Sequence, residues 1–138
     1  MPNVRSLTAL AAALLALLVT AAPAAASCPA PSSADLAAIK GVEQPALPEG
    51  RQVIADGVVT GDFLGRDRLN GFYLQQATEQ GPVGLFVYMP AATQSDAERI
   101  APGEHIQLHA RTGEHRGQVQ LQRVERIETC ASDRLPAP

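Results

Sequence analysis

Short runs of β-forming residues, separated by Gly, Pro, Asp and Asn, fill the chain from Gln52 onward. Runs of this length and spacing are typical of an all-β barrel or sandwich. The pattern constrains the fold strongly, because a chain of 138 residues forms one domain, or two at most. It predicts five strands, at Gln52–Phe63, Asn70–Gln76, Val83–Met89, Glu104–Thr112 and Gln118–Ile127.

The fourth and fifth runs show the alternation of a half-buried strand. Apolar residues take every second position, so one face is predicted to enter the core and the other to meet water. In the fourth run the apolar residues are Ile106, Leu108 and Ala110, and the polar ones are His105, Gln107, His109 and Arg111. In the fifth run Val119 and Leu121 alternate with Gln118, Gln120 and Gln122, and Thr112–Gly117 is predicted to form the hairpin turn.

Two short helices are predicted outside the strands. The first follows Ser32–Asp35, with a serine as its N-cap and an acid in its first turn, and it ends at Gly41 before the proline-containing stretch Pro45–Gly50. The second lies within Thr93–Ile100, with Ser95 as its predicted cap. Three strands, a short helical connection and two further strands are the element order of the five-stranded OB barrel. We therefore predict an all-β OB-fold barrel with two short helices.

The N-terminal residues have the pattern of an export signal. Arg5 supplies positive charge, Leu7–Thr20 an apolar stretch and Ala24–Ala26 the small residues expected before a cleavage site. The alternatives are a membrane-spanning helix, for which the stretch is short, and lipidation at Cys28. The predicted parts are thus a signal peptide (1–26), a helix and linker (27–50), the barrel (51–130) and a C-terminal tail (131–138), in a periplasmic or extracellular protein.

The two cysteines, Cys28 and Cys130, stand near the two ends of the predicted mature domain. In an oxidising compartment they are predicted to form a disulfide that ties these ends together. The alternatives are two free thiols or a metal pair. Two cysteines without a nearby histidine make a poor metal site.

Four of the five aromatic residues lie on the second and third predicted strands. Alternation places Tyr73 and Gln75 on one face of the second strand and Phe72 on the other, where it is expected to fill the core. On the third strand Phe86 and Tyr88 share a face, although Phe86 lacks a polar group and also suits the core. Single-stranded nucleic acids bind OB folds by stacking bases on such aromatic rings.

Four arginines fall in or near the two loops that bind ligands in an OB fold, which follow strands one and four. They are Arg66, Arg68, Arg111 and Arg116. Arginine can bind phosphate bidentately and stack on bases, but ordinary solvated charges would give the same pattern. Removing Arg5 with the signal changes the net charge from −3 to −4, so no basic field attracts polyanions from a distance.

Catalytic chemistry has little support in the sequence. His105 and His109 would lie about 13 Å apart on a strand and could not share an ion. Phosphate-binding glycine loops, serine elbows and paired Cys-x-x-Cys motifs do not occur. Asp56 and Asp62 are too few for a metal-dependent nuclease, which needs clustered carboxylates. We therefore predict a protein that is not an enzyme and has no cofactor or metal.

A family resemblance covers most of the predicted mature chain. Val53–Gln75, Gly84–Tyr88, Pro102–Leu108 and Gly113–Leu121, with the motifs GVVTGDF, GFYLQ and GLFVY in this order, resemble the OB-fold domain that precedes the catalytic domain in secreted bacterial nucleases of the endonuclease/exonuclease/phosphatase type. Leu36–Gly41 resembles the helix leading into that domain, and a cysteine near each end recurs there. The resemblance implies a nucleic-acid-binding fold. The chain stops where the nuclease domain would begin, so catalysis is not implied.

These observations predict an exported OB-fold module that binds single-stranded nucleic acid and acts with a separate secreted nuclease. The site residues predicted for this role are Tyr73, Gln75, Phe86, Tyr88, Arg66, Arg68, Arg111 and Arg116. The alternative, which the acidic balance favours, is a protein that binds a small ligand, an oligosaccharide or a partner protein.

Overall fold

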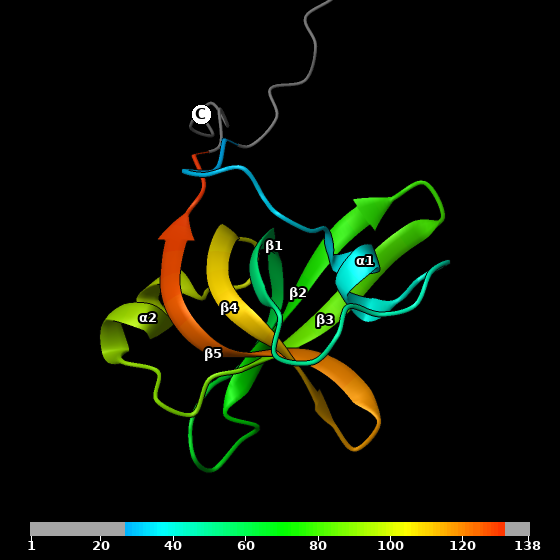
Figure 1. The fold of residues 1–138 in the computed structure, drawn as a ribbon. Helices are drawn as coiled ribbons and strands as arrows, with labels where there is room; N and C mark the ends of the chain where they lie inside the picture. Colours follow the sequence, from blue (N-terminus) through cyan, green and yellow to red (C-terminus); the bar gives the residue numbers. More distant parts are fainter. Residues whose placement is uncertain (1–26, 132–138) are drawn as a thin grey trace, which may run out of the picture.

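Five strands close into a barrel in the computed structural model, which describes residues 27–131 (Figure 1). The strands are β1 (Gln52–Phe63), β2 (Gly71–Thr78), β3 (Gly81–Tyr88), β4 (His105–His115) and β5 (Gln118–Thr129), and the helices are α1 (Leu36–Lys40) and α2 (Gln94–Arg99). The predicted all-β class, the five strands and the two short helices are confirmed. The predicted signal peptide and residues 132–138 of the tail lie outside the described residues.

The strand order around the barrel is β1-β2-β3-β5-β4, after which β4 returns to β1. The long strand β1 makes this closure possible, because its first half pairs with β4 and its second half with β2. All pairs are antiparallel except β3 with β5, which are parallel and meet only where Phe86 faces Gln120 and Val87 faces Leu121. The barrel is therefore closed by one short parallel contact.

The barrel core follows the predicted alternation. Phe72, Leu74, Leu85 and Val87 point inward from β2 and β3, and Ile106, Leu108 and Ala110 do so from β4, all at 2% exposure or less. Helix α1 packs against β1, β3 and β5 and adds Leu36 and Ile39 to the same cluster. The N-terminal helix is thus part of the core rather than a separate lead-in.

The predicted helix caps are wrong in both helices. Asp35, not a serine, caps α1, and its carboxylate accepts from the amide of Ala38. Thr93, not Ser95, caps α2, where its hydroxyl and the Asp96 carboxylate form a reciprocal capping box. Several adjacent residues at each site are good caps, so residue type alone does not decide which of them caps the helix.

The predicted solvated face of β4 is also partly wrong. Gln107 is fully buried, because the segment before α1 crosses this face. Its amide nitrogen donates to the carbonyl of Ala30 at 2.6 Å, and its amide oxygen accepts from the amide of Ala30 at 3.0 Å. The alternation along β4 could not predict this burial, because the segment that covers Gln107 lies 77 residues away in sequence.

The predicted disulfide between Cys28 and Cys130 is present, and Ser27 and Ala131 form a β-bridge beside it. The two ends of the described chain are thereby held together at one side of the barrel (Figure 1). A disulfide is consistent with an exported protein. Within residues 27–131, no helix has the length and apolar character needed to cross a membrane.

Candidate functional site

The outer face of β2 and β3 carries an exposed aromatic cluster. Tyr73 is 40% exposed and Tyr88 is 38% exposed, as the alternation predicted. Phe86 lies between them on the same face and is half-buried, so it does not enter the core. Its ring centroid lies 5.1 Å from that of Tyr73 at an interplanar angle of 58°. These three rings are the aromatic residues that were predicted to form a binding surface.

Phe63 and Arg68 extend the cluster toward the β1–β2 loop. The Phe63 ring meets Tyr73 edge-on, with centroids 6.0 Å apart, and the Arg68 guanidinium lies 5.2 Å from the centre of the Phe63 ring. Arg68 also donates to the backbone carbonyl of Asp62. Phe63 was not among the predicted site residues, because only the pairing of β1 with β2 brings it beside Tyr73.

A groove of about 430 Å³ runs between this cluster and the β4–β5 hairpin. One wall holds the aromatic rings together with Leu69, and the other consists mostly of polar residues of the hairpin. The lining residues are Leu69, Tyr73, Phe86, Tyr88, Glu114, His115, Gln118, Val119, Gln120 and Gln122. We call this hollow the aromatic groove. It offers flat apolar surfaces on one side and amide hydrogen-bonding groups on the other.

A second hollow of about 320 Å³ continues the aromatic groove on the far side of Tyr73 and Phe86. It also shares Gln118 and Val119 with the groove, and Lys40 of α1 lies at its edge. The Lys40 ammonium donates to the carbonyl of Gly84 at 3.0 Å, which holds the cation beside the aromatic cluster. Lys40 was not among the predicted site residues, because α1 and β3 meet only in the folded protein.

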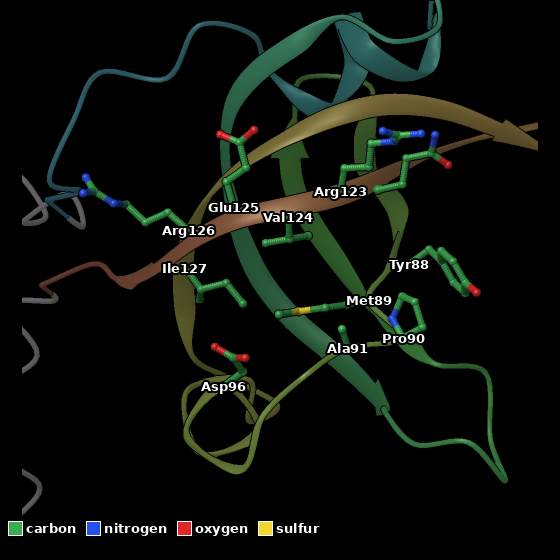
Figure 2. Close-up of a pocket in the computed structure, with 11 residues that line it drawn as sticks. Tyr88, Met89, Pro90, Ala91, Asp96, Arg123, Val124, Glu125, Arg126 and Ile127 are labelled. Carbon is green, nitrogen blue, oxygen red and sulfur yellow. The ribbon is translucent and has the colours of Figure 1, made fainter.

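Another hollow, of about 530 Å³, lies on the other side of Tyr88 (Figure 2). The chain after β3 and the second half of β5 line it, with Met89, Val124 and Ile127 among the apolar residues. Tyr88 and Gln122 line both this hollow and the aromatic groove. Tyr88 thus stands between two hollows on one continuous surface.

The predicted arginines do not gather at one place. Arg66 and Arg68 are exposed in the β1–β2 loop, and Arg116 is exposed at the tip of the β4–β5 hairpin. Arg111 lies elsewhere: it donates to the carbonyl of Gly50 at 3.1 Å and lines a hollow with Glu49 and Arg123. Its expected position beside the turn is wrong, because β4 continues to His115. Gln75 is exposed on the outer face of β2 but lines none of the hollows described above.

The charge of the aromatic groove itself is low. Among the described residues that line it, Glu114 is the one carboxylate and no arginine or lysine occurs. Arg68, Arg116 and Lys40 stand around it instead. The lining therefore presents mainly ring surfaces and amide groups, and the cations stand at its periphery.

Comparison with known proteins does not place the chain in a family, since no protein-family model and no curated protein matches it.

Proposed function

We propose that the protein is an exported OB-fold module that binds single-stranded nucleic acid along the aromatic groove, as an accessory to a separate secreted nuclease. The strand order β1-β2-β3-β5-β4 supports the OB assignment. Ligands of OB folds lie across strands two and three, between the loops that follow strands one and four. The aromatic groove occupies this surface. The signal-like residues 1–26 and the disulfide support a periplasmic or extracellular location.

The observation that carries the proposal is the exposure of Tyr73 and Tyr88, with the half-buried Phe86 on the same face, beside a groove. Exposed rings on adjacent strands leave apolar surface in water, which their packing against each other only partly covers. A nucleobase can stack on such a ring whatever its identity, and stacking contributes about 1–3 kcal/mol per base. Two or three stacked bases would give a useful affinity without strong phosphate contacts.

The amide side chains suit the edges of stacked bases. Gln118, Gln120 and Gln122 each carry both donors and acceptors, as base edges do. Gln120 is only 8% exposed and donates to the Gln122 amide oxygen at 3.3 Å, so part of this array is held in place. The peripheral cations Arg68, Arg116 and Lys40 can then contact the phosphates. With about three such contacts the salt dependence would be modest, with a slope near −2 in log–log form for a single strand.

A second candidate is a neutral oligosaccharide. The observation that favours it is the lining of the aromatic groove. Amides and Glu114 accompany the rings there, and the described residues that line the groove include no lysine or arginine. A sugar ring also packs on an aromatic face while its hydroxyls bond to amides. This ligand would bind with no dependence on salt, which separates it from nucleic acid.

Fluorescence anisotropy with a labelled single-stranded oligonucleotide at low salt tests the proposal. Saturable binding is expected, and Tyr73→Ala is expected to weaken it roughly 5–150-fold, the equivalent of one lost stack. Val58→Ala is the matched control, because Val58 is 37% exposed on β1 and lies outside the groove. Absence of binding, or equal affinity for the two variants, would contradict the proposal. A salt-independent response to neutral oligosaccharides alone would favour the second candidate.

A further inference from the structure

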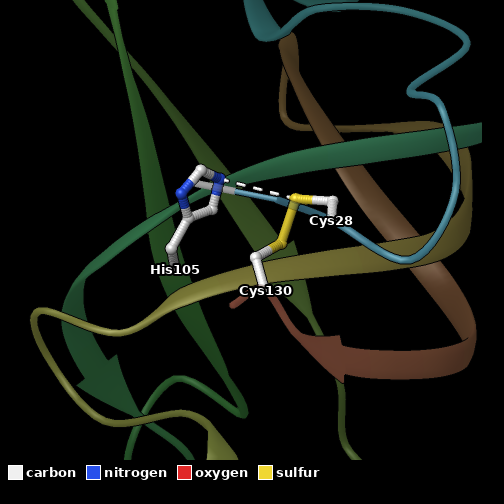
Figure 3. A group of neighbouring side chains, drawn as sticks. All are labelled: Cys28, His105 and Cys130. Atoms are coloured by element: carbon white, nitrogen blue, oxygen red, sulfur yellow. Dashed lines mark hydrogen bonds between the residues drawn. A yellow bond between two sulfur atoms is a disulfide. The ribbon is translucent and has the colours of Figure 1, made fainter. Parts of the chain in front are cut away.

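Cysteine, histidine and aspartate, three types of side chain that bind metal ions, lie together at the disulfide. This place is on the side of the barrel away from the aromatic groove. The Nε2 atom of His105 lies 3.8 Å from the Sγ of Cys28, and the ligand atoms of Cys28, Cys130 and His105 all lie within 4.8 Å of one another (Figure 3). The Asp56 carboxylate lies 2.6 Å from the same histidine nitrogen. These four residues are called the staple cluster. The sequence does not predict that His105 lies beside the cysteines, because it is 77 residues from Cys28.

The residues of the staple cluster are held in place by contacts that do not involve the sulfur atoms. The amide of Cys130 donates to the carbonyl of His105 at 2.9 Å, and Ser27 is bridged to Ala131. The Asp56 carboxylate accepts from the hydroxyl of Ser32. In the folded protein these contacts keep the two cysteines, the imidazole and the carboxylate next to each other without help from the S–S bond.

The spacing matches what a zinc ion requires. Ligands at 2.0–2.3 Å from a tetrahedral Zn²⁺ stand roughly 3.3–3.8 Å from one another. The His105–Cys28 distance of 3.8 Å already has this value, and the sulfur atoms of two reduced cysteines must move apart from bonding distance toward it. Asp56 now contacts the nitrogen that would bind the ion, so a small outward shift brings its oxygen to ligand spacing.

We propose that, when the disulfide is reduced, Cys28, Cys130, His105 and Asp56 bind one Zn²⁺ ion and tie the two ends of the domain together in its place. A dithiol reductant supplies two electrons and two protons to the Sγ–Sγ bond, giving two thiols, and is itself oxidised to a disulfide. The ion then displaces both thiol protons, because zinc binds the thiolate form. Two thiolates, one imidazole and one carboxylate are all ligand types that zinc accepts, and together they supply the four positions of a tetrahedral site.

Cobalt titration of the reduced protein tests the site, because tetrahedral Co²⁺ bound to thiolates absorbs strongly in the visible and Co²⁺ replaces Zn²⁺ in such sites. The purified protein is reduced with a phosphine, freed of metal and titrated with Co²⁺, then with Zn²⁺. We expect one equivalent of Co²⁺ to produce the absorption and one equivalent of Zn²⁺ to abolish it. The oxidised protein, whose sulfur atoms bond to each other, is expected to remain colourless.

Two variants separate the staple cluster from binding by thiols alone. His105→Ala is expected to abolish the tetrahedral absorption, whereas His109→Ala, four residues along β4, is expected to leave it unchanged. Asp56→Asn replaces a proposed carboxylate ligand by a neutral amide and is expected to weaken Co²⁺ binding at least about 10–100-fold, because that range already applies when only an outer partner of a ligand is lost. Equal spectra for the His105 and His109 variants would overturn the proposal.

Thermal unfolding of the reduced protein gives a second readout that does not depend on colour. Zn²⁺ that binds only the folded state raises the unfolding temperature by mass action. We expect a clear rise in the reduced protein, or recovery of folding if reduction alone unfolds it, and no rise in the oxidised protein. A reduced protein that Zn²⁺ neither stabilises nor refolds would also overturn the proposal.

Discussion

A single glycine sets the shape of the aromatic surface at the residue scale. Gly71 begins β2 directly beneath the ring of Phe86, and a Cβ atom built there would overlap both the Phe86 ring and the carbonyl of Val87. The absence of a side chain lets the ring of Phe86 lie against the backbone of the neighbouring strand. Phe86 is thereby placed beside Tyr73, in the middle of the groove wall.

Gly71→Ala is therefore expected to destabilise the fold by about 1–3 kcal/mol, the usual cost of overpacking, and to weaken ligand binding by displacing Phe86. Gly84→Ala is the matched control on β3, since a Cβ there meets only the carbonyl of Leu74 at 3.8 Å. Urea denaturation of both variants gives the comparison. Equal stabilities would show that the close approach at Gly71 is not what positions the ring.

Strand periodicity was enough to predict which side chains point into the core and which point outward. Alternation along β2 and β3 correctly separated Phe72 in the core from Tyr73 and Tyr88 outside. It could not find Phe63, Lys40 or the neighbours of His105, because these meet their partners through strand pairing and helix docking across long sequence separations.

At the scale of elements, the β4–β5 hairpin differs from the predicted six-residue turn. The turn consists of Arg116 and Gly117 alone, at φ 51° and 78°, between the paired residues His115 and Gln118. Positive φ at both central residues is the geometry of a type I′ turn. Thr112 and Gly113 were mistaken for turn residues, but both lie in β4, where Gln122 packs against Gly113. The longer hairpin is what forms the second wall of the aromatic groove.

Arg116→Asn tests the role of the hairpin tip without damaging the turn. Asparagine before glycine is favoured in type I′ turns, so stability is expected to stay equal or rise by a few tenths of a kcal/mol. Loss of one phosphate contact is expected to weaken oligonucleotide binding and to make the salt slope shallower by about 0.7.

Anisotropy titrations at several salt concentrations measure the slope for this variant and for Arg51→Asn, a control in which the exposed arginine before β1 is replaced. A slope that changes equally in both variants would mean that the hairpin arginine makes no specific contact.

At the scale of the whole molecule, the disulfide joins the N-terminal segment to the C-terminal end of the barrel. The segment before α1 covers Gln107, α1 completes the core, and the disulfide fixes both to the end of β5. The strand count, the order of elements and the disulfide were predictable because turn residues and cysteines mark them directly. The packing of the N-terminal segment and α1 against the barrel was not predictable. Their few apolar residues form no periodic pattern long enough to indicate where they pack.

Replacing both Cys28 and Cys130 by serine is expected to lower the free energy of unfolding by about 4–5 kcal/mol. The sequence separation of 102 residues and the chain-entropy model give this magnitude. Guanidinium denaturation in metal-free buffer measures the loss. A loss below about 1 kcal/mol would indicate that the β-bridge and α1 hold the ends together without the covalent bond.

Tyrosine fluorescence tests the central claim, ligand binding on the aromatic groove, most directly. The chain has two tyrosines and no tryptophan, and Tyr73 and Tyr88 both line the groove, so its tyrosine emission comes from this surface. A single-stranded oligonucleotide that stacks on these rings is predicted to quench the emission saturably, beyond the absorbance correction obtained with free tyrosine amide. Unchanged emission while anisotropy reports binding would place the ligand elsewhere and contradict the account.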